Sequence, residues 1–255
     1  MEFVEFHDWV YKELGVSLNS YKPTQLNRRI SSLMDRMGIK SLEEYRDLLK
    51  RDLKERDAFL DYITINVTEF FRNPEFFAAL KKEIENNLLP SNKKLKIWSA
   101  GCSLGCEAYS LCMLLSEMGV KVDYNILATD IDKNILKRAK EAVYSNIDIK
   151  GLDKKYLDKY FTKSDDKYKV DLKLKSKVSF KRHDLILDRY EKDFDLILCR
   201  NVIIYFKDDV KQKIIERFIE SLRPGGLLFV GATESINTYK IHGLEKLSPF
   251  IYRKI

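Results

Sequence analysis

The sequence predicts an α/β protein whose main part is a doubly wound parallel sheet, with a small all-helical domain at the N-terminus and a small antiparallel β insertion. Three observations support this fold class. From residue 95 onward, short apolar runs alternate with amphipathic segments, which is typical of strands joined by crossover helices. Residues 1–65 show only the helical spacing of apolar side chains. The apolar run 194–206, which begins beside acids, indicates a buried strand of a parallel sheet.

The composition is that of an ordinary globular protein. The 255 residues are 45% hydrophobic and 33% charged, which is enough for one large core and a small helical domain. No apolar run approaches the roughly 18 residues of a membrane span, and the N-terminus lacks the apolar core of a secretory signal. We therefore expect a cytoplasmic, monomeric protein that does not insert into a membrane. The four cysteines fit reduced thiols better than disulfides, and their spacing, with no histidine nearby, predicts no metal site.

The helical domain, residues 1–65, carries an uneven charge. Residues 21–40 contain five bases and one acid. Three of these bases, Arg28, Arg29 and Arg36, lie on one predicted helix, with Arg29 and Arg36 two turns apart on the same face. This face is either an ordinary solvated surface or a docking surface for an acidic helix or a phosphate backbone. The predicted helices are 2–14, one from Pro23 to Gly38, one opened by a capping box at Ser41, and 53–65.

Two further regions complete the predicted organisation. Residues 66–90 form a polar and aromatic linker followed by a connecting helix that starts at Pro74. Residues 91–255 form the α/β domain, with the β insertion at about 144–181. Within the insertion, apolar residues alternate with Lys and Asp over 167–180, which predicts one half-exposed strand. The other predicted elements are a helix near 152–161, strands 95–99, 124–129, 196–199, 227–231 and an edge strand at 250–252, helices 105–118, 132–142 and 208–222, and a turn at 223–226.

Three strand ends carry the candidate chemistry. The loop after the first strand contains Gly101 and Gly105, which let the backbone approach a ligand closely, and it leads into a helix N-terminus with free N–H groups. It is not G-x-G-x-x-G, which disfavours a dinucleotide. The second strand ends at Asp130, where a carboxylate can accept hydrogen bonds from both ribose hydroxyls of a nucleoside. The buried strand near 196–199 ends in Arg200-Asn201, a pair that could serve structure or chemistry. Together, the glycine loop, Asp130 and a last strand that no helix follows favour a Rossmann-type methyltransferase that uses S-adenosylmethionine.

Three segments resemble the signature segments of CheR-type chemotaxis receptor methyltransferases: 66–72 (NVTEFFR), 199–206 (CRNVIIYF) and 223–228 (RPGGLL). The similarity spans nearly the whole chain. It implies a protein-glutamate O-methyltransferase that transfers a methyl group from S-adenosylmethionine to carboxylates on the cytoplasmic helices of chemoreceptors, leaves S-adenosylhomocysteine, and sets adaptation in bacterial chemotaxis. The residues expected to bind the cofactor are Asn66, Thr68, Arg72, Gly101, Glu107, Asp130, Asp184, Leu185, Arg200 and Asn201.

The resemblance also implies roles for the reacting groups. Arg72, Arg200 and Tyr205 would face the transferred methyl group and the incoming carboxylate. A glutamate is already an anion at neutral pH, so the enzyme has to desolvate and aim it and needs no general base. An Arg and a Tyr hydroxyl suit that task because each can orient a carboxylate by hydrogen bonding. Arg200 is expected to act by positioning, since too strong an ion pair would blunt the nucleophile.

The sequence departs from the family pattern in two places. Family members often have Glu-Glu-Pro where this chain has Cys106-Glu107-Ala108, and often Asn at the place of Asp184. On the substrate side, the resemblance makes Arg28, Arg29 and Arg36 candidates for steering an acidic receptor helix. Members that dock on a C-terminal receptor pentapeptide share a Gly-containing hairpin loop in the insertion. The loop expected here, 162–167, is short and lacks Gly, so we expect no dependence on that tether.

Two alternatives remain at this point. A nucleic-acid methyltransferase would fit the net charge of +7, but the strand ending at Cys199 is not followed by the Asn/Asp-Pro-Pro-aromatic arrangement of amine methylation. Nor does the Pro of cytosine-C5 enzymes precede Cys199, so we expect no nucleic-acid partner. A catalytically silent S-adenosylmethionine-binding module is the other alternative. The presence of Arg72, Asp130, Arg200 and Tyr205 argues against it.

Overall fold

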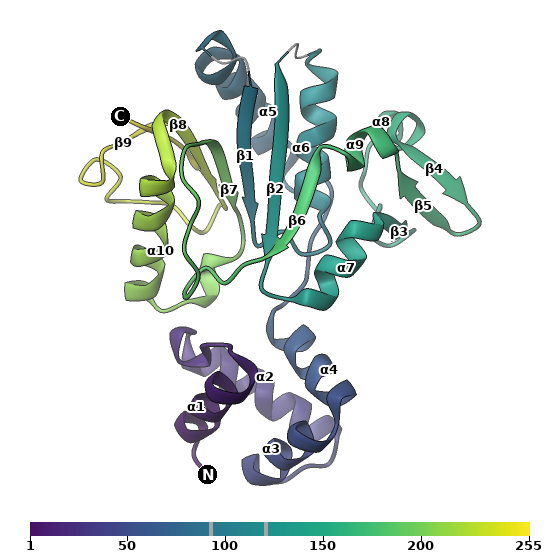
Figure 1. Ribbon diagram of the computed structural model, residues 1–255, viewed down its shortest axis with the longest axis vertical. Helices are drawn as coiled ribbons and strands as arrows, with labels where there is room; N and C mark the ends of the chain where they lie inside the picture. Colours follow the sequence, from purple (N-terminus) through teal and green to yellow (C-terminus); the bar gives the residue numbers. More distant parts are fainter. Residues whose placement is uncertain (92–93, 120–121) are drawn as a thin grey trace. The chain divides into compact units, whose positions relative to one another are not determined.

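The computed structural model describes residues 1–91, 94–119 and 122–255 (Figure 1). Their contacts divide the chain into two units. Residues 1–66 and 204–213 form a helical unit, whereas 67–203 and 214–255 form the α/β unit. None of the helices in the described ranges is both long and apolar enough to cross a membrane.

The helical unit is held together by three aromatic rings. Phe6 and Tyr45 stack with their ring centroids 5.9 Å apart, and Phe59 packs edge-on against them at 6.0 and 5.7 Å. All three rings are almost fully buried, so this cluster is the core of the unit. Its helices are α1 (Phe3–Leu14), α2 (Pro23–Arg36), α3 (Leu42–Arg51) and α4 (Leu53–Ile63), with a short 3₁₀ turn at Leu18–Ser20.

The capping box predicted for α3 forms with a shift of one residue. The Ser41 hydroxyl accepts a hydrogen bond from the Glu44 N–H at 3.2 Å, as expected for an N-cap. The Glu44 carboxylate, however, accepts from the N–H of Lys40 at 3.3 Å rather than from that of Ser41. The helix therefore starts where the sequence predicted.

The segment that contains Tyr205 belongs to the helical unit. The Lys22 N–H donates to the Tyr205 carbonyl at 2.9 Å, and the Lys207 N–H donates to the Ser20 carbonyl at 3.0 Å. The Phe206 ring packs on that of Tyr21 with centroids 4.7 Å apart. The apolar run that looked like one long strand thus has two parts, since only its first six residues lie in the sheet.

The α/β unit contains a seven-stranded sheet in the order β6-β2-β1-β7-β8-β10-β9 (Figure 1). The first five of these strands are parallel, and β10 runs antiparallel to both of its neighbours. The strand order reverses between β1 and β7, which is the point where open α/β sheets bind ligands. The strands are β1 (Lys94–Ala100), β2 (Asp123–Asp130), β6 (Val178–Arg182), β7 (Phe194–Cys199), β8 (Leu222–Val230), β9 (Leu244–Ser248) and β10 (Ile251–Lys254).

Alternating side chains of β1 serve the two faces of the sheet. Ile97 belongs to the large core cluster that also contains Leu80 of α5, whereas Trp98 packs edge-on against Phe218 of α10 with centroids 5.3 Å apart. Both faces are therefore covered, as a parallel sheet requires. The helices are α5 (Pro74–Glu83), which continues as a π-helical turn at Ile84–Leu88, α6 (Cys106–Glu117), α7 (Lys133–Glu141) and α10 (Asp208–Ser221).

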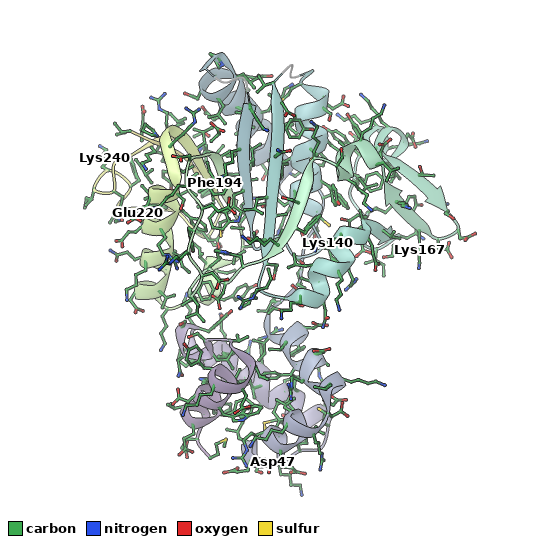
Figure 2. All side chains as sticks on the ribbon, in the orientation of Figure 1. Asp47, Lys140, Lys167, Phe194, Glu220 and Lys240 are labelled. Carbon is green, nitrogen blue, oxygen red and sulfur yellow. The ribbon has the colours of Figure 1, made fainter. Side chains whose placement is uncertain are left out.

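The predicted insertion is a three-stranded antiparallel sheet in the order β3-β5-β4. Its elements are β3 (Val143–Ser145), α8 (Lys154–Tyr160), β4 (Phe161–Ser164) and β5 (Lys167–Val170). The pairing of Ser164 with Lys167 leaves Asp165 and Asp166 as a two-residue turn, in which Asp165 has φ 54°. Figure 2 shows Lys167 at the outer end of this hairpin. The loop predicted at 162–167 is thus too long, because its outer residues pair as strands.

The single strand predicted over 167–180 is wrong. β5 ends at Val170, and a short helix, α9 (Leu172–Lys175), follows it, capped by Asp171, whose carboxylate accepts from the Lys173 N–H at 2.6 Å. The next strand, β6, pairs parallel with β2 and forms an edge of the main sheet. Alternation of apolar and charged residues over so short a stretch also fits a single helical turn, which is why the pattern wrongly predicted a continuous strand.

Two predictions for the C-terminal part also need correction. The strand predicted at the sheet edge, 250–252, corresponds to β10, which lies between β8 and β9. The true edge strand, β9, was missed because only its first residue is buried and its residues lack an alternating pattern. The turn predicted at 223–226 lies within β8, where the register with β7 shifts and Gly225 has φ 76°.

Candidate active site

The glycine loop lies at the carboxyl end of β1. The N–H groups of Gly101 and Cys102 both donate to the Thr129 carbonyl at 2.8 Å, which ties the loop to β2. Gly101 has φ 77°, and a Cβ built on it would lie 2.4 Å from a methyl group of Val202. Only glycine therefore fits where the loops after β1 and β7 touch.

Asp130, at the end of β2, faces the same loop. Its carboxylate accepts hydrogen bonds from the N–H of Ser103 at 2.8 Å and from that of Asp132 at 3.1 Å. The side chain is buried, and burial raises the pKa of Asp130 to about 6 despite these hydrogen bonds. The hydroxyl of Ser103 is also buried and has no hydrogen-bond partner. A buried carboxylate beside an unsatisfied hydroxyl suits a ligand that brings hydroxyl groups.

Glu107 and Arg200 form a buried ion pair across the loops. Glu107 lies in the first turn of α6, where the Ser99 hydroxyl donates to its carboxylate at 2.9 Å. The Arg200 Nη1 is 3.6 Å from Glu107 Oε2, with 2% and 14% of the two side chains exposed. Burial raises the pKa of Glu107, and Arg200 and Ser99 oppose that rise. The pair therefore places both charges in the interior, where they depend on each other.

The remaining contacts of Arg200 fix the linker. Its Nη2 donates to the Arg72 carbonyl at 2.8 Å and to the Asn73 side chain at 3.0 Å. The guanidinium lies over the Phe229 ring, 4.8 Å from its centroid, and 5.5 Å from that of Phe77. Only Nε is buried without a hydrogen-bond partner. Arg200 thus orders the wall of the site.

The linker that carries Thr68 and Arg72 is anchored by aromatic side chains. Phe70 packs edge-on against Tyr144 with centroids 4.9 Å apart, and Phe71 stacks on Tyr156 at 4.4 Å. Both partners lie in the insertion. The linker is also tied to α6, since the Phe71 N–H donates to the Ser110 hydroxyl at 2.8 Å. Rigid anchoring matters here because Phe71 and Asn73 both adopt positive φ, 48° and 59°.

Asp184 and Leu185 follow β6 in a tightly held loop. Asp184 Oδ1 accepts from the N–H groups of Ile186 and Leu187 at 2.7 and 3.2 Å. Its Oδ2, buried, has no hydrogen-bond partner, and its nearest cation is Arg182 at 3.9 Å. Arg217 of α10 donates to the Leu185 carbonyl at 2.8 Å. The loop is therefore rigid, and it keeps one buried acceptor for a ligand.

The predicted residues fall into two groups. The α/β unit brings together the loops and linker bearing Arg72, Gly101, Glu107, Asp130, Arg200 and Asn201, with Thr68, Asp184 and Leu185 on adjoining segments. Asn66, Tyr205, Arg28, Arg29 and Arg36 belong to the helical unit. Of these, Arg29 has an internal role: its guanidinium lies 4.2 Å from the centroid of the Tyr62 ring and donates to the Tyr62 carbonyl. The roles assigned to both groups stay predictions.

Glu234 is absent from the site residues predicted from the sequence. This residue is fully buried and accepts hydrogen bonds from four backbone N–H groups, three of them in the segment after Arg200. The one available signal was its position, because Glu234 comes three residues after the glycine that follows a buried strand. An acid so close to a buried strand needs a partner, since acids are rarely buried unless paired. The described residues contain no cluster of His, Cys, Asp and Glu that could hold a metal ion.

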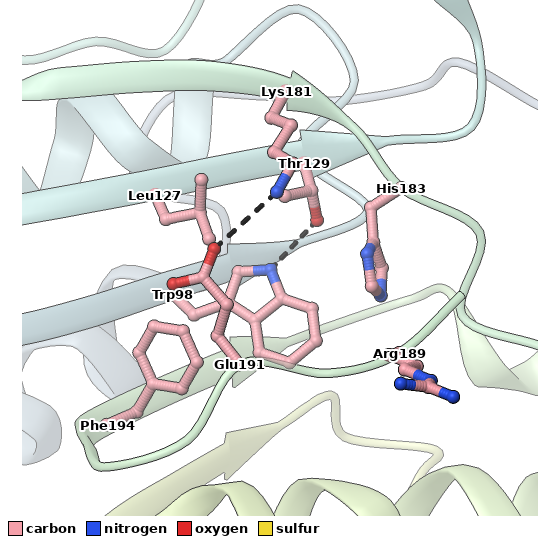
Figure 3. Close-up of a pocket in the computed structure, with 8 residues that line it drawn as sticks. All are labelled: Trp98, Leu127, Thr129, Lys181, His183, Arg189, Glu191 and Phe194. Carbon is pink, nitrogen blue, oxygen red and sulfur yellow. Dashed lines mark hydrogen bonds and ion pairs between the residues drawn. The ribbon is translucent and has the colours of Figure 1, made fainter.

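A small pocket lies on the other side of the same strand ends (Figure 3). It is lined by neighbours of the site residues, Thr129 beside Asp130 and His183 beside Asp184. Successive side chains of a strand point to opposite faces of the sheet. Thr129 therefore points into this pocket, whereas Asp130 points toward the glycine loop. Its volume of about 20 Å³ has room for one water molecule. The pocket is lined by Trp98, Leu127, Thr129, Lys181, His183, Arg189, Glu191 and Phe194.

The parallel sheet with its antiparallel last strands, the glycine loop at the switch point and the buried Asp130 define an α/β methyltransferase of the S-adenosylmethionine-dependent class. Residues 66–248 match the family described as CheR methyltransferase, SAM binding domain, and residues 1–64 match CheR methyltransferase, all-alpha domain. The chain belongs to the CheR methyltransferase family.

Curated relatives match over nearly the whole length. The chemotaxis protein methyltransferase of Listeria monocytogenes is 40% identical, over 99% of this chain and 97% of the relative. Chemotaxis protein methyltransferase 1 of Pseudomonas aeruginosa is 36% identical over the same shares. The chemotaxis protein methyltransferase of Borreliella burgdorferi is 35% identical over 96% of this chain and 91% of the relative. The similarity thus covers both the helical and the α/β units.

Proposed function

We propose that this chain methylates glutamate side chains on the cytoplasmic helices of chemoreceptors, with S-adenosylmethionine as the methyl donor. Family membership supports the reaction class. The observation that carries the site assignment is the buried Glu107–Arg200 pair beside the glycine loop and the linker. This arrangement offers fixed charges and no free general base, which suits a substrate that is already an anion.

Buried polar groups of the α/β unit, two of them with an unsatisfied oxygen, fit the cofactor. Asp130, with the Ser103 hydroxyl near it, would hold the ribose hydroxyls. Glu107 would hold the amino group of the methionine part, and the free Oδ2 of Asp184 offers an acceptor to the amino group of the purine. S-adenosylmethionine supplies an activated methyl group on a sulfonium. The chain's own task is to orient this group, with Arg72, Asn201, Thr68, Asn66, Gly101 and Leu185 completing the proposed binding set.

In the proposed transfer, a lone pair of the acceptor carboxylate forms the new C–O bond while the C–S bond breaks and its electrons return to sulfur. The products are a glutamyl methyl ester and S-adenosylhomocysteine, and no proton is transferred. Arg200 would act by position, because its Nη atoms are engaged with Glu107, Arg72 and Asn73. Arg72 and Tyr205 would aim the carboxylate in line with the methyl group.

The hairpin of the insertion supports a tether-independent enzyme. Its turn contains only Asp165 and Asp166 and has no Gly. Family members that use a receptor's C-terminal pentapeptide resemble one another in a Gly-containing loop at this place. We therefore infer that this chain recognises the methylated region of its receptor directly.

One labelling experiment tests the proposal. The protein is incubated with methyl-labelled cofactor and with receptor cytoplasmic fragments, with or without a C-terminal pentapeptide, or with RNA. We expect base-labile label on the receptor fragments, at equal rates with and without the pentapeptide. Base-stable label on RNA would establish a nucleic-acid methyltransferase. Cofactor binding without any transfer would establish a silent binding module, and a rate that depends on the pentapeptide would contradict the inference about the tether.

A further inference from the structure

Glu234 forms a backbone clamp at the edge of the site. Its Oε1 accepts from the N–H groups of Val202 and Ile203, both at 2.9 Å. Its Oε2 accepts from the N–H groups of Asn201 at 2.7 Å and Gly231 at 2.8 Å. The residue is 0% exposed, and within the described ranges no lysine or arginine forms an ion pair with it. Backbone N–H groups therefore supply the hydrogen bonds that hold this carboxylate, and the charge of the buried Arg200 also attracts it.

The clamp depends on an unusual backbone conformation. Asn201 has φ 60°, and this left-handed residue turns three successive N–H groups toward one point, as in an anion-binding nest. A Cβ on Gly231 would lie 2.3 Å from Glu234 Oε2 and 3.0 Å from the Asn201 nitrogen. Glycine is therefore required at 231 for the carboxylate to enter. An internal glutamate occupies a nest that would otherwise attract an external anion.

The clamped segment reaches the site on both sides. Arg200 immediately precedes it and contacts Glu107, Arg72 and Asn73 through its side chain. Val202, in its middle, touches the glycine loop at Gly101. A shift of the clamped backbone would therefore move the Arg200–Glu107 pair and the glycine loop together.

We propose that Glu234 is a positioning residue for methyl transfer, whose carboxylate fixes the backbone of 201–203 and thereby the placement of Arg200 and Asn201. This inference rests on the proposed function. A positioning role differs from a purely structural role in one measurable respect. A structural residue would change the fraction of folded enzyme, whereas a positioning residue changes the turnover of each folded, cofactor-binding molecule.

The Glu234→Gln variant tests this difference. Whichever way the amide is turned, its NH₂ group faces two of the four N–H donors, so the clamp loses half of its acceptors. We expect kcat per cofactor-binding site, counted by calorimetry with S-adenosylhomocysteine, to fall on the order of a hundredfold, as for misplacement by about 1 Å. The amide NMR signals of Asn201, Val202, Ile203 and Gly231 should shift. Glu220→Gln is the matched control, because Glu220 is exposed on α10 and pairs with Lys192 at 3.3 Å (Figure 2).

A second variant, Glu234→Ala, empties the nest. We expect formate, at constant ionic strength, to restore part of the transfer rate of this variant and to leave Glu220→Gln unchanged. If Glu234→Gln does not fold, Glu234→Asp replaces it, with kcat per site expected below that of the wild type. Wild-type kcat in the folded Gln or Asp variant would overturn the proposal. A wild-type enzyme without transfer activity would refute the proposed function instead. Even then, unchanged amide signals in the folded Glu234 variant would show that the clamp does not hold this backbone.

Discussion

Arg200 of the α/β unit and the exposed arginines of the helical unit differ in their burial and in their partners. In the α/β unit, 2% of the Arg200 side chain is exposed, and it donates to the linker while pairing with a buried glutamate. In the helical unit, Arg28 and Arg36 are exposed on α2, although Arg36 also lies 5.3 Å from the centroid of the Tyr62 ring. The buried arginine can fix geometry, whereas the exposed ones mainly add charge to a surface.

Residue type and spacing alone do not assign a role to an arginine in this protein. Arg29 belongs to the predicted basic face, yet its guanidinium packs on Tyr62 and donates to its carbonyl, which ties α2 to α4. Arg200 was predicted to position reacting groups; it is buried, pairs with Glu107 and donates to the Arg72 carbonyl, and its role in the reaction stays a prediction. Burial and partners separate the two cases, and both can be tested by removing the side chain.

Removal of the Arg200 side chain should have the largest effect. In Arg200→Ala the Glu107 carboxylate is left buried without its cation, and the linker loses two hydrogen bonds. We expect transfer to fall by a hundredfold or more, on the order of what misplaced reacting groups cost. Breaking such a pair also costs about 3–5 kcal/mol of stability. Labelled transfer and urea unfolding measure the two effects.

A second substitution separates these two effects. Adding Glu107→Gln to Arg200→Ala removes the unpaired charge, so we expect most of the lost stability to return while transfer stays low. If instead transfer recovered together with stability, Arg200 would be needed only to neutralise Glu107, and its assigned role in the site would be wrong.

Asp130 should make cofactor affinity depend on pH. Burial raises its pKa to about 6, and only the ionised form can accept two hydroxyl hydrogen bonds. Affinity for S-adenosylhomocysteine should therefore fall as the pH drops through 6, by up to about tenfold per unit below it. Stability changes in the opposite direction. Because the folded pKa lies above the usual value of 3.8, this group favours folding at low pH, and that contribution is lost as the pH rises from about 4 through 6.

The Asp130→Asn variant isolates this contribution. An uncharged amide should bind the product about 10- to 100-fold more weakly at pH 7, since it loses charged hydrogen bonds of about 1.5–3 kcal/mol. Between pH 5 and 7 its affinity should change less with pH than that of the wild type. Calorimetry over this range measures both. Identical pH profiles for the two proteins would exclude Asp130 from the binding site.

Local patterns were sufficient to predict much of the α/β unit. The periodicity of apolar residues indicated β1, β2, β7 and α10, and the ends of the predicted strands pointed to Gly101, Asp130 and Arg200. The predictions of these strands and of the helix are confirmed. Because ligands of parallel sheets bind at strand ends, position along a strand also suggests candidate site residues, whose roles stay predictions.

The features that the sequence did not indicate depend on distant partners. Glu234 meets N–H groups that lie 31 to 33 residues earlier, and no local period announces such a contact. The place of β10 inside the sheet likewise depends on β9, which has a weak pattern of its own. The short alternating stretch after Val170 fitted both a strand and a helical turn, and only tertiary packing decided between them.

The smallest expected effect concerns the exposed arginines of α2. Reversing two of them, Arg28→Glu with Arg36→Glu, should weaken recognition of an acidic receptor helix several-fold at limiting receptor, through slower association. Added salt should reduce the difference from the wild type, because exposed charges are screened within about 8 Å at physiological ionic strength. Affinity for S-adenosylhomocysteine should not change. The rate of labelled transfer, measured against receptor concentration at two ionic strengths, tests this prediction.

Two controls make the result specific to α2. Lys137→Glu with Lys140→Glu changes the net charge by the same amount at exposed positions of α7, on which Figure 2 labels Lys140. This pair should leave receptor recognition nearly intact. Arg29→Met should instead lower the unfolding temperature, because it removes the contacts with Tyr62. If the α7 pair weakened recognition as much as the α2 pair, net charge rather than a docking face would explain the effect. In that case the exposed arginines of α2 would have no specific role in recognition of the receptor.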